Sequence, residues 1–138
     1  IREYVDACKV QAATQGYVET LLGRRRYFPE LQSTTRVHAG LRAAAERMAI
    51  NMPIQGTAAD IIKIAMIRLH GELQARRLHS RLLLQVHDEL VLEVPPEELD
   101  EVASLVCRTM EGAYKLRAPL VADVKVGDNW GVMSPVHT

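Results

Sequence analysis

Two adjacent carboxylates, Asp88 and Glu89, follow His87 at the join of two apolar runs, 82–86 and 90–94. A tight hairpin favours glycine-containing pairs, because glycine accepts positive φ at little cost. His-Asp-Glu has no glycine, so turn chemistry alone does not account for these residues. Neighbouring carboxylates in apolar surroundings need water, a basic group or a metal to offset their repulsion. Their oxygen ligands suit Mg²⁺ or Mn²⁺ rather than zinc, and a solvent-exposed acidic turn is the open alternative.

A second set of polar residues, Arg47, Asn51 and Gln55, recurs every four positions. This spacing places the three side chains on one face of a helix. All three donate hydrogen bonds, and the two amides also accept them. Such a row can meet the minor groove of a duplex, where every base pair offers an N3 or O2 acceptor. An ordinary solvated helix face is the alternative interpretation.

The basic run Arg24, Arg25 and Arg26 has two interpretations. It can hold phosphate, or it can form salt bridges within the fold. Alternate positions of a strand face opposite ways, which favours an internal role for at least one of the three arginines.

The elements around these residues follow from periodicity and from helix and turn signals. We expect a helix over 1–15 that ends at Gly16, a small hairpin from 17–22 and 24–28, and a loop over 30–40. A long helix is predicted over 41–78, with a kink or break at Pro53. Its apolar face is formed by Ala58, Ile61, Ile62, Ala65, Met66, Leu69 and Leu73.

The segment 82–94 reads as two strands that are apolar on both faces, which predicts that both faces are covered. A helix follows Pro95 and Pro96, with acidic residues at its N-terminal end. Its buried side is predicted to hold Leu99, Val102, Val106, Met110 and Ala113. A last strand over 121–126 and a turn over 127–130 complete the chain. The fold class is α/β of the α+β type, an antiparallel sheet backed by helices.

Composition sets outer limits. The chain has 138 residues, 48% of them hydrophobic, enough for one modest domain with its own core. Residues 1–80 carry twelve Lys/Arg and seven Asp/Glu, whereas residues 81–138 carry five and ten. This asymmetry predicts contact with a polyanion on one side and room for a cation in the acidic half.

The two cysteines and the hydropathy exclude some classes of protein. Cys8 and Cys107 lack zinc-ligand spacing, so we expect two buried or idle thiols in a reducing compartment. No apolar run approaches the length of a membrane span.

Several motifs, taken in order, resemble one family. They are GYVETL at 16–21, GRR at 23–25, RAAAER at 42–47, NMPIQGTAAD at 51–60 and QVHDEL at 85–90. Together they resemble the C-terminal end of the family A DNA polymerases, the bacterial DNA polymerase I family. The resemblance extends to about Trp130.

The resemblance implies a right-hand polymerase, with residues 1–40 as the end of the fingers and residues 41–138 as part of the palm. Asp88 matches the catalytic metal-binding aspartate of the palm motif C, and Glu89 matches an auxiliary acid. His87 matches a residue that contacts the primer end. The implied primer–template DNA contacts are Arg47, Asn51 and Gln55.

The implied activity is transfer of nucleotides from dNTPs to a primer 3′-hydroxyl, with two Mg²⁺ ions, or Mn²⁺, as cofactors. The implied setting is DNA replication and repair in the bacterial cytoplasm, at the nucleoid and away from membranes. No stretch here matches the family's motif A aspartate or its nucleotide-binding helix. The isolated chain is therefore expected to be inactive without the remainder of the polymerase chain.

Two other functions are compatible with the residues alone. One is a different two-metal phosphotransferase or nuclease built on Asp88 and Glu89, which would need a second acidic cluster. The other is a non-catalytic DNA-binding module, although lysine would suit phosphate contact better than an Asp-Glu pair.

Overall fold

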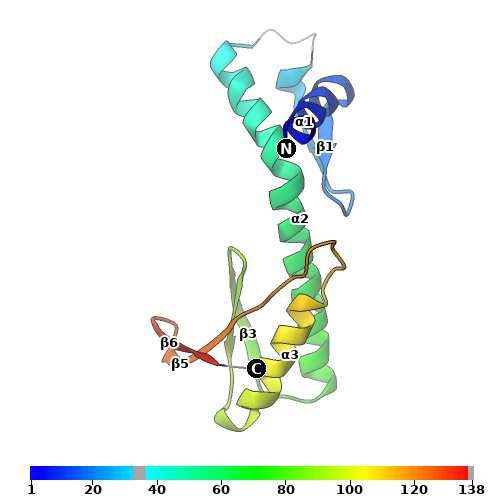
Figure 1. The fold of residues 1–138 in the computed structure, drawn as a ribbon. Coiled ribbons are helices and arrows are strands. Elements are labelled where there is room, and N and C mark those ends of the chain that lie inside the picture. Colours follow the sequence, from blue (N-terminus) through cyan, green and yellow to red (C-terminus); the bar gives the residue numbers. More distant parts are fainter. Residues whose placement is uncertain (33–36, 137–138) are drawn as a thin grey trace. The chain divides into compact units, whose positions relative to one another are not determined.

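The computed structural model in Figure 1 describes residues 1–32 and 37–136. The chain forms two compact units, Ile1–Asp60 and Ile61–Thr138, and helix α2 (Ala39–Ala75) contributes residues to both. Part of the loop predicted at 30–40, residues 33–36, lies outside the described residues. The units divide after Asp60, and the assignment of residues 1–40 to the fingers stays a prediction.

The first unit begins with helix α1 (Arg2–Gln15). Gly16 ends the helix as predicted, with a φ of 79° in the left-handed region that glycine adopts most readily. Strands β1 (Tyr17–Glu19) and β2 (Arg25–Tyr27) pair antiparallel, which confirms the predicted hairpin with shorter strands. A short 3₁₀ helix, η1 (Pro29–Leu31), follows.

The core of the first unit joins the two helices and the hairpin. Val18 and Phe28 from the hairpin region pack with Ala12 of α1 and with Ala45 and Ala49 of α2. Small alanine side chains let the helices approach closely. The core is completed by Leu31 and, at its margin, by Met52.

A kink or a break was predicted at Pro53. Helix α2 runs without interruption through this residue, so there is no break, and the kink stays a prediction. Proline removes one backbone donor, and the carbonyl of Ala49 loses its usual helical partner. The helix continues because residues on both sides of Pro53, Ala49 and Thr57, are buried in the same unit. The Thr57 hydroxyl also donates to the carbonyl of Pro53.

The second unit places one hairpin against two helical segments. Strands β3 (Arg81–Val86) and β4 (Glu89–Glu93) pair antiparallel, as predicted. A 3₁₀ turn, η2 (Pro96–Glu98), leads into helix α3 (Leu99–Glu111). The core contains Leu69 and Leu73 of α2, Val102 and Leu105 of α3, and, at its margin, Leu78, Leu90, Leu92, Val94 and Val106.

The predicted apolar faces of the two helices are confirmed in part. In α2, Ala65, Leu69 and Leu73 are buried, whereas Ala58 is exposed. The predicted side of α3 omitted Leu105, which is 3% exposed.

The end of the chain differs from the predicted strand and turn. Strand β5 (Val124–Asn129) extends through the predicted turn, and a second strand, β6 (Val132–Val136), pairs with it. Gly127 explains the difference, because a Cβ there would lie 1.9 Å from the carbonyl oxygen of Val132. Gly127 allows the two strands to approach closely, whereas the residues 127–130 had been predicted to form a turn.

The strands form three two-stranded sheets, β1–β2, β3–β4 and β5–β6. The class of mixed helices and antiparallel strands is confirmed. The prediction that both faces of the 82–94 hairpin are covered is wrong for the described residues, since Leu83 and Leu84 are 54% and 49% exposed. Strand β3 pairs with β4 alone. None of the described helices is long and apolar enough to span a membrane.

Candidate functional site

The His-Asp-Glu sequence lies at the tip of the β3–β4 hairpin. Val86 pairs with Glu89, so His87 and Asp88 alone form the turn. His87 has a φ of 55°, and Asp88 is not among the described residues with positive φ. A two-residue turn with positive φ at its first position has the sign pattern of type II′, in which glycine is usual there. Histidine at this position therefore carries backbone strain, a feature often found at functional sites.

A side chain supports this turn. The Gln85 amide donates to the carbonyl oxygen of His87, which fixes the peptide between His87 and Asp88. His87, Asp88 and Glu89 are all exposed. The strands therefore hold two carboxylates in solvent at a defined place.

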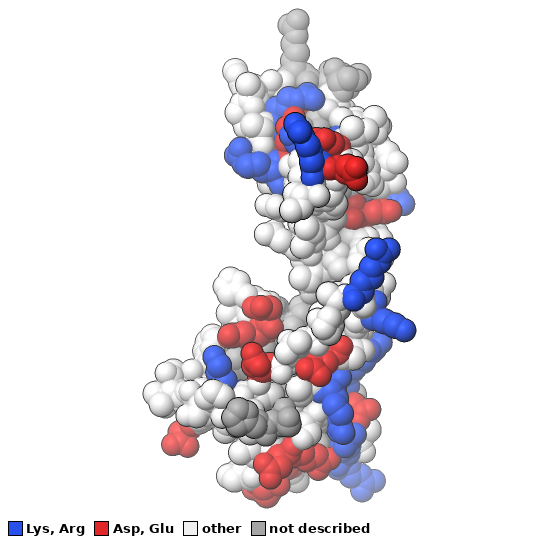
Figure 2. All heavy atoms as spheres, viewed as in Figure 1, with Lys and Arg blue, Asp and Glu red and all other residues white. Residues whose placement is uncertain are grey.

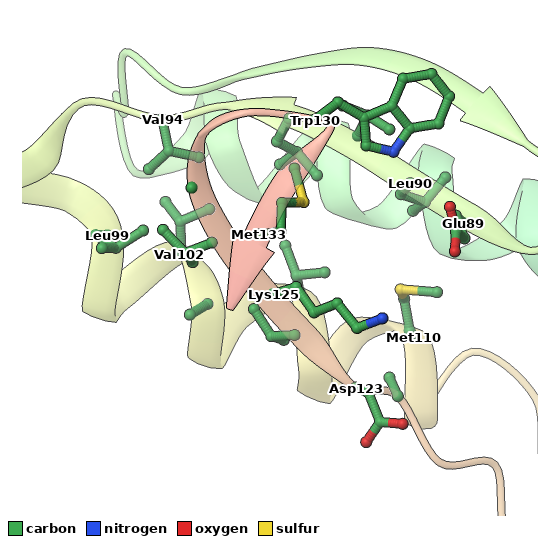
Figure 3. Close-up of a pocket in the computed structure, with 18 of the residues that line it drawn as sticks. Glu89, Leu90, Val94, Leu99, Val102, Met110, Asp123, Lys125, Trp130 and Met133 are labelled. Carbon is green, nitrogen blue, oxygen red and sulfur yellow. The ribbon is translucent and has the colours of Figure 1, made fainter. Parts of the chain in front are cut away.

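A cavity of about 710 Å³ opens beside this turn, between the hairpin, α3 and the β5–β6 sheet. Asp88 of the turn and Glu89 at the start of β4 line it on one side, and Asp123, just before β5, and Lys125 of β5 line it on another. In Figure 3, Glu89, Asp123 and Lys125 lie toward one end of the cavity, with Val94, Leu99 and Val102 toward the other. The cavity thus has a charged end and an apolar end.

Two carboxylates alone supply fewer oxygen ligands than a divalent cation needs. None of the ion pairs between described residues involves Asp88 or Glu89, so both keep their oxygens available. Within residues 1–32 and 37–136, no group of three or more His, Cys, Asp or Glu side chains is close enough to hold a metal ion. A divalent cation at Asp88 would therefore need further ligands from water, a bound phosphate or additional polypeptide.

The predicted donor row lies on α2 in the first unit. Arg47, Asn51 and Gln55 are all exposed, whereas Ala45 and Ala49 of the same helix are buried. The helix therefore packs through one side and presents the three donors to solvent on the other. The row and the His-Asp-Glu turn belong to different compact units.

The arginines of the basic run are engaged within the fold. Arg24 forms an ion pair with the buried carboxylate of Asp60. Arg25 bonds to Glu19 at 3.2 Å and stacks 4.5 Å from the ring centre of Tyr17. Arg26 lies 5.4 Å from the ring centre of Phe28. These contacts favour the internal interpretation of the run over a free phosphate-binding arm.

Charge is also unevenly placed within the second unit. On the face drawn in Figure 2, acidic side chains lie over the left part and the lower end of this unit, and most of its basic side chains run along the right edge. Four acidic residues follow each other closely where η2 leads into α3: Glu97, Glu98, Asp100 and Glu101. This acidic group flanks a helix N-terminus, where negative charge is stabilising.

Sequence reasoning missed one polar cluster entirely. Thr20, Thr57 and Asp60 are buried at 5%, 7% and 6% exposure, and they bring the β1–β2 turn onto α2. In the sequence, Asp60 is the last residue of the 51–60 motif, and no role was predicted for it. Its partner lies forty residues away, so no short spacing in the sequence signals the contact.

Comparison with known proteins gives a consistent result. The family model for DNA polymerase family A matches residues 1–132. DNA polymerase I, thermostable, of Thermus filiformis is 52% identical over 130 residues, which are 94% of this chain and 15% of that protein. DNA polymerase I of Bacillus caldotenax is 50% identical over 94% of this chain and 14% of its own length. The chain thus spans about 15% of the length of the curated relatives it matches.

A solved structure is also similar. The POL domain of Pol1 from M. smegmatis, in complex with DNA primer-template and dNTP, aligns with a TM-score of 0.79 and 51% identity. The alignment covers 86% of this chain and 20% of that one.

Proposed function

This chain belongs to DNA polymerase family A, and from that premise we propose that it is part of a DNA-directed DNA polymerase. In this proposal it carries half of the catalytic metal site and part of the surface that holds primer–template DNA. The reaction is transfer of a nucleotide from a dNTP to a primer 3′-hydroxyl.

The observation that carries the proposal is the His-Asp-Glu turn. A strained two-residue turn lifts Asp88 and Glu89 clear of the core on a paired hairpin. Paired strands fix both ends of this two-residue turn, so Asp88 is held more precisely than it would be in a longer loop. A purely structural turn would be served better by glycine at position 87.

In the proposed site Asp88 holds a metal ion and Glu89 is an auxiliary acid near it. Two divalent cations, Mg²⁺ or Mn²⁺, would when bound lower the pKa of the primer 3′-hydroxyl and stabilise charge on the α-phosphate and pyrophosphate. The oxygen-only donor pair suits these hard cations. A second acidic residue, outside the residues described here, would complete the ligand set.

His87 is proposed to contact the primer end. Its imidazole lies next to Asp88 in the chain, so a primer terminus brought to the carboxylate would also meet the histidine. Both ring nitrogens of histidine can take part in hydrogen bonds to sugar or phosphate oxygens.

The proposed duplex contacts are Arg47, Asn51 and Gln55. Their exposure and their common side of α2 support this role. Minor-groove acceptors are shared by all base pairs, so such donors would test the shape of the duplex and not its sequence.

The proposed parts of the polymerase are the end of the fingers over residues 1–40 and part of the palm over residues 41–138. The proposed partners are primer–template DNA, dNTP and the remainder of the polymerase chain. An enzyme with these partners would act on the chromosome, at the nucleoid of a bacterial cytoplasm.

Primer extension tests the proposal. The isolated chain would be assayed with Mg²⁺ and all four dNTPs, beside the same chain mixed with a separately produced upstream polymerase fragment. We expect extension in the mixture and none with the isolated chain. Extension by the isolated chain would show that its residues hold a complete metal site. Extension in neither, with DNA binding retained and both parts folded and associated, would favour a non-catalytic DNA-binding module.

A further inference from the structure

The turn between β1 and β2 is attached to α2 by a buried hydrogen bond. The Thr20 hydroxyl donates to a carboxylate oxygen of Asp60 at 2.7 Å. Both residues are almost fully buried, at 5% and 6% exposure. A buried carboxylate is costly unless it is paired, and Arg24 supplies the charge by pairing with the other oxygen of Asp60.

The same hydroxyl also closes the turn. The backbone N–H groups of Leu22 and Arg24 donate to the Thr20 oxygen at 3.3 and 3.1 Å. Leu21, which directly follows Thr20, donates its backbone N–H to the Thr57 hydroxyl at 3.1 Å. Thr20 therefore shapes the turn and joins it to the helix at once.

Gly56 provides the space for this attachment. A Cβ at position 56 would lie 2.6 Å from the Cγ2 methyl of Thr20, closer than two carbon atoms tolerate. Glycine within a helix is destabilising relative to alanine, so its presence in α2 is explained by the close approach of the turn. By contrast, Gly71 of the same helix has open space around it.

The attachment lies behind the donor row. Asp60 follows Asn51 by nine residues, about two and a half helical turns, and so points to the opposite side of α2. Thr57 is also buried, whereas Asn51 and Gln55 are exposed. The β1–β2 turn thus holds α2 from the side away from the three donors.

We propose that the Thr20 turn, seated on Gly56, Thr57 and Asp60, is a positioning element for the duplex-contacting row of α2. This inference rests on the proposed function. Neither Thr20 nor Asp60 touches DNA in it; they act by fixing the helix segment that carries Asn51 and Gln55. Weakening the contact of the Thr20 turn with Gly56, Thr57 and Asp60 should lower the affinity for primer–template DNA before it affects the chemistry at Asp88.

The test uses a steric clash and its relief, in the complete polymerase that carries these residues. Gly56→Ala pushes a methyl group against the Thr20 methyl. Thr20→Ser removes that methyl and keeps the hydroxyl that bonds to Asp60. We would measure KM for primer–template, kcat and the thermal midpoint for each single variant and for the double variant, with Gly71→Ala as the matched control.

The expected result is a rescue. Gly56→Ala should raise KM for primer–template about tenfold, as expected when one or two hydrogen bonds to the duplex are lost, with a smaller effect on kcat. Adding Thr20→Ser should return KM to within about twofold of the parent, since the clash is gone. Gly71→Ala should leave KM unchanged.

Two results would overturn the inference. One is a Gly56→Ala enzyme with a lowered thermal midpoint and an unchanged KM. The contact between the Thr20 turn and α2 would then serve stability alone. The other is a raised KM that Thr20→Ser does not relieve, which would place Gly56 itself against the DNA. Failure of the proposed function is seen separately, because the parent enzyme would then not extend a primer at all.

Discussion

The Glu98 carboxylate accepts two hydrogen bonds from Ser80, from its backbone N–H at 2.9 Å and from its hydroxyl at 2.6 Å. The backbone N–H of His79 donates to the other oxygen at 2.8 Å. Hydrogen bonds from the His79 backbone, followed by those from Ser80, lower the pKa of Glu98 to about 2 from its ordinary 4.5. One carboxylate thus holds the chain where it leaves α2 and enters β3.

Because of these hydrogen bonds, the free energy of unfolding decreases at acid pH. Because the folded pKa of Glu98 is below its unfolded value, its contribution is complete above pH 4.5 and is lost as the pH falls toward 2. Glu98→Gln should lower the thermal midpoint at pH 7 and flatten its fall between pH 4.5 and 2. Unfolding followed by circular dichroism would measure this. Glu97→Gln, at an exposed neighbour, should leave the profile unchanged, and identical profiles for both variants would contradict the assignment.

Asp88→Ala should nearly abolish nucleotide addition by the complete enzyme. Loss of a metal-binding carboxylate removes electrostatic stabilisation of the transition state, for which single-group losses of about 10²–10³ in rate are typical. Affinity for primer–template DNA should stay close to the parent value in a gel-shift assay. Asp128→Ala changes an exposed aspartate of β5 and serves as the control. Unchanged turnover in the Asp88 variant would reject the proposed metal site.

Gln55→Ala should slow extension or relax discrimination at the primer end, by about threefold to tenfold. The estimate corresponds to a net hydrogen bond of about 0.5–1.5 kcal/mol. Single-turnover extension of matched and mismatched primers would measure the change. The control is Gln74→Ala, an exposed glutamine on the same helix. If Gln55→Ala changed only the thermal midpoint, the donor row would be structural.

Two substitutions of His87 distinguish the role of its imidazole from that of its backbone conformation. His87→Gly and His87→Ala both remove the imidazole, so both should slow extension. The glycine variant should be more stable than the alanine variant by about 1 kcal/mol, because alanine pays a steric cost at a φ of 55°. Urea unfolding would compare the two. Equal stabilities would mean that the turn relaxes to another conformation when histidine is replaced.

The core of the second unit gives a stability prediction. Leu69 is fully buried and packs with Leu73, Val102 and Leu105. Leu69→Ala should cost about 2–5 kcal/mol of unfolding free energy, since it leaves a cavity among these side chains. Ile67→Ala on the same helix changes a residue that is 73% exposed and should cost far less. Similar losses at both positions, measured by urea unfolding, would contradict the observed packing.

Local signals predicted much of the fold. Gly16 marked the end of α1, and the apolar runs on either side of His87 marked the β3–β4 hairpin, because both features depend on neighbouring residues. Strand β6 was missed because Gly127 and Asn129 are typical of turns. Their role depends on the approach of Val132, which local sequence does not encode.

In the candidate site too, local sequence identified some residues, whereas contacts between distant residues appeared only in the structure. Asp88 and Glu89 were found because they are adjacent, and the donor row because helical spacing is regular. The hydrogen bond between Thr20 and Asp60 joins residues forty positions apart, and only folding brings these two residues together. The partners of Arg24 and Arg26 were likewise hidden, since charge alone does not say which side chain an arginine meets.

Each strand of this chain pairs with a single neighbour, so every one of the described sheets has two open edges. In β3 such an edge is combined with the exposed side chains of Leu83 and Leu84. Open edges with apolar side chains favour pairing between molecules. Strand β3 is therefore a place where two copies of this chain can pair, and a low protein concentration during refolding limits such pairing.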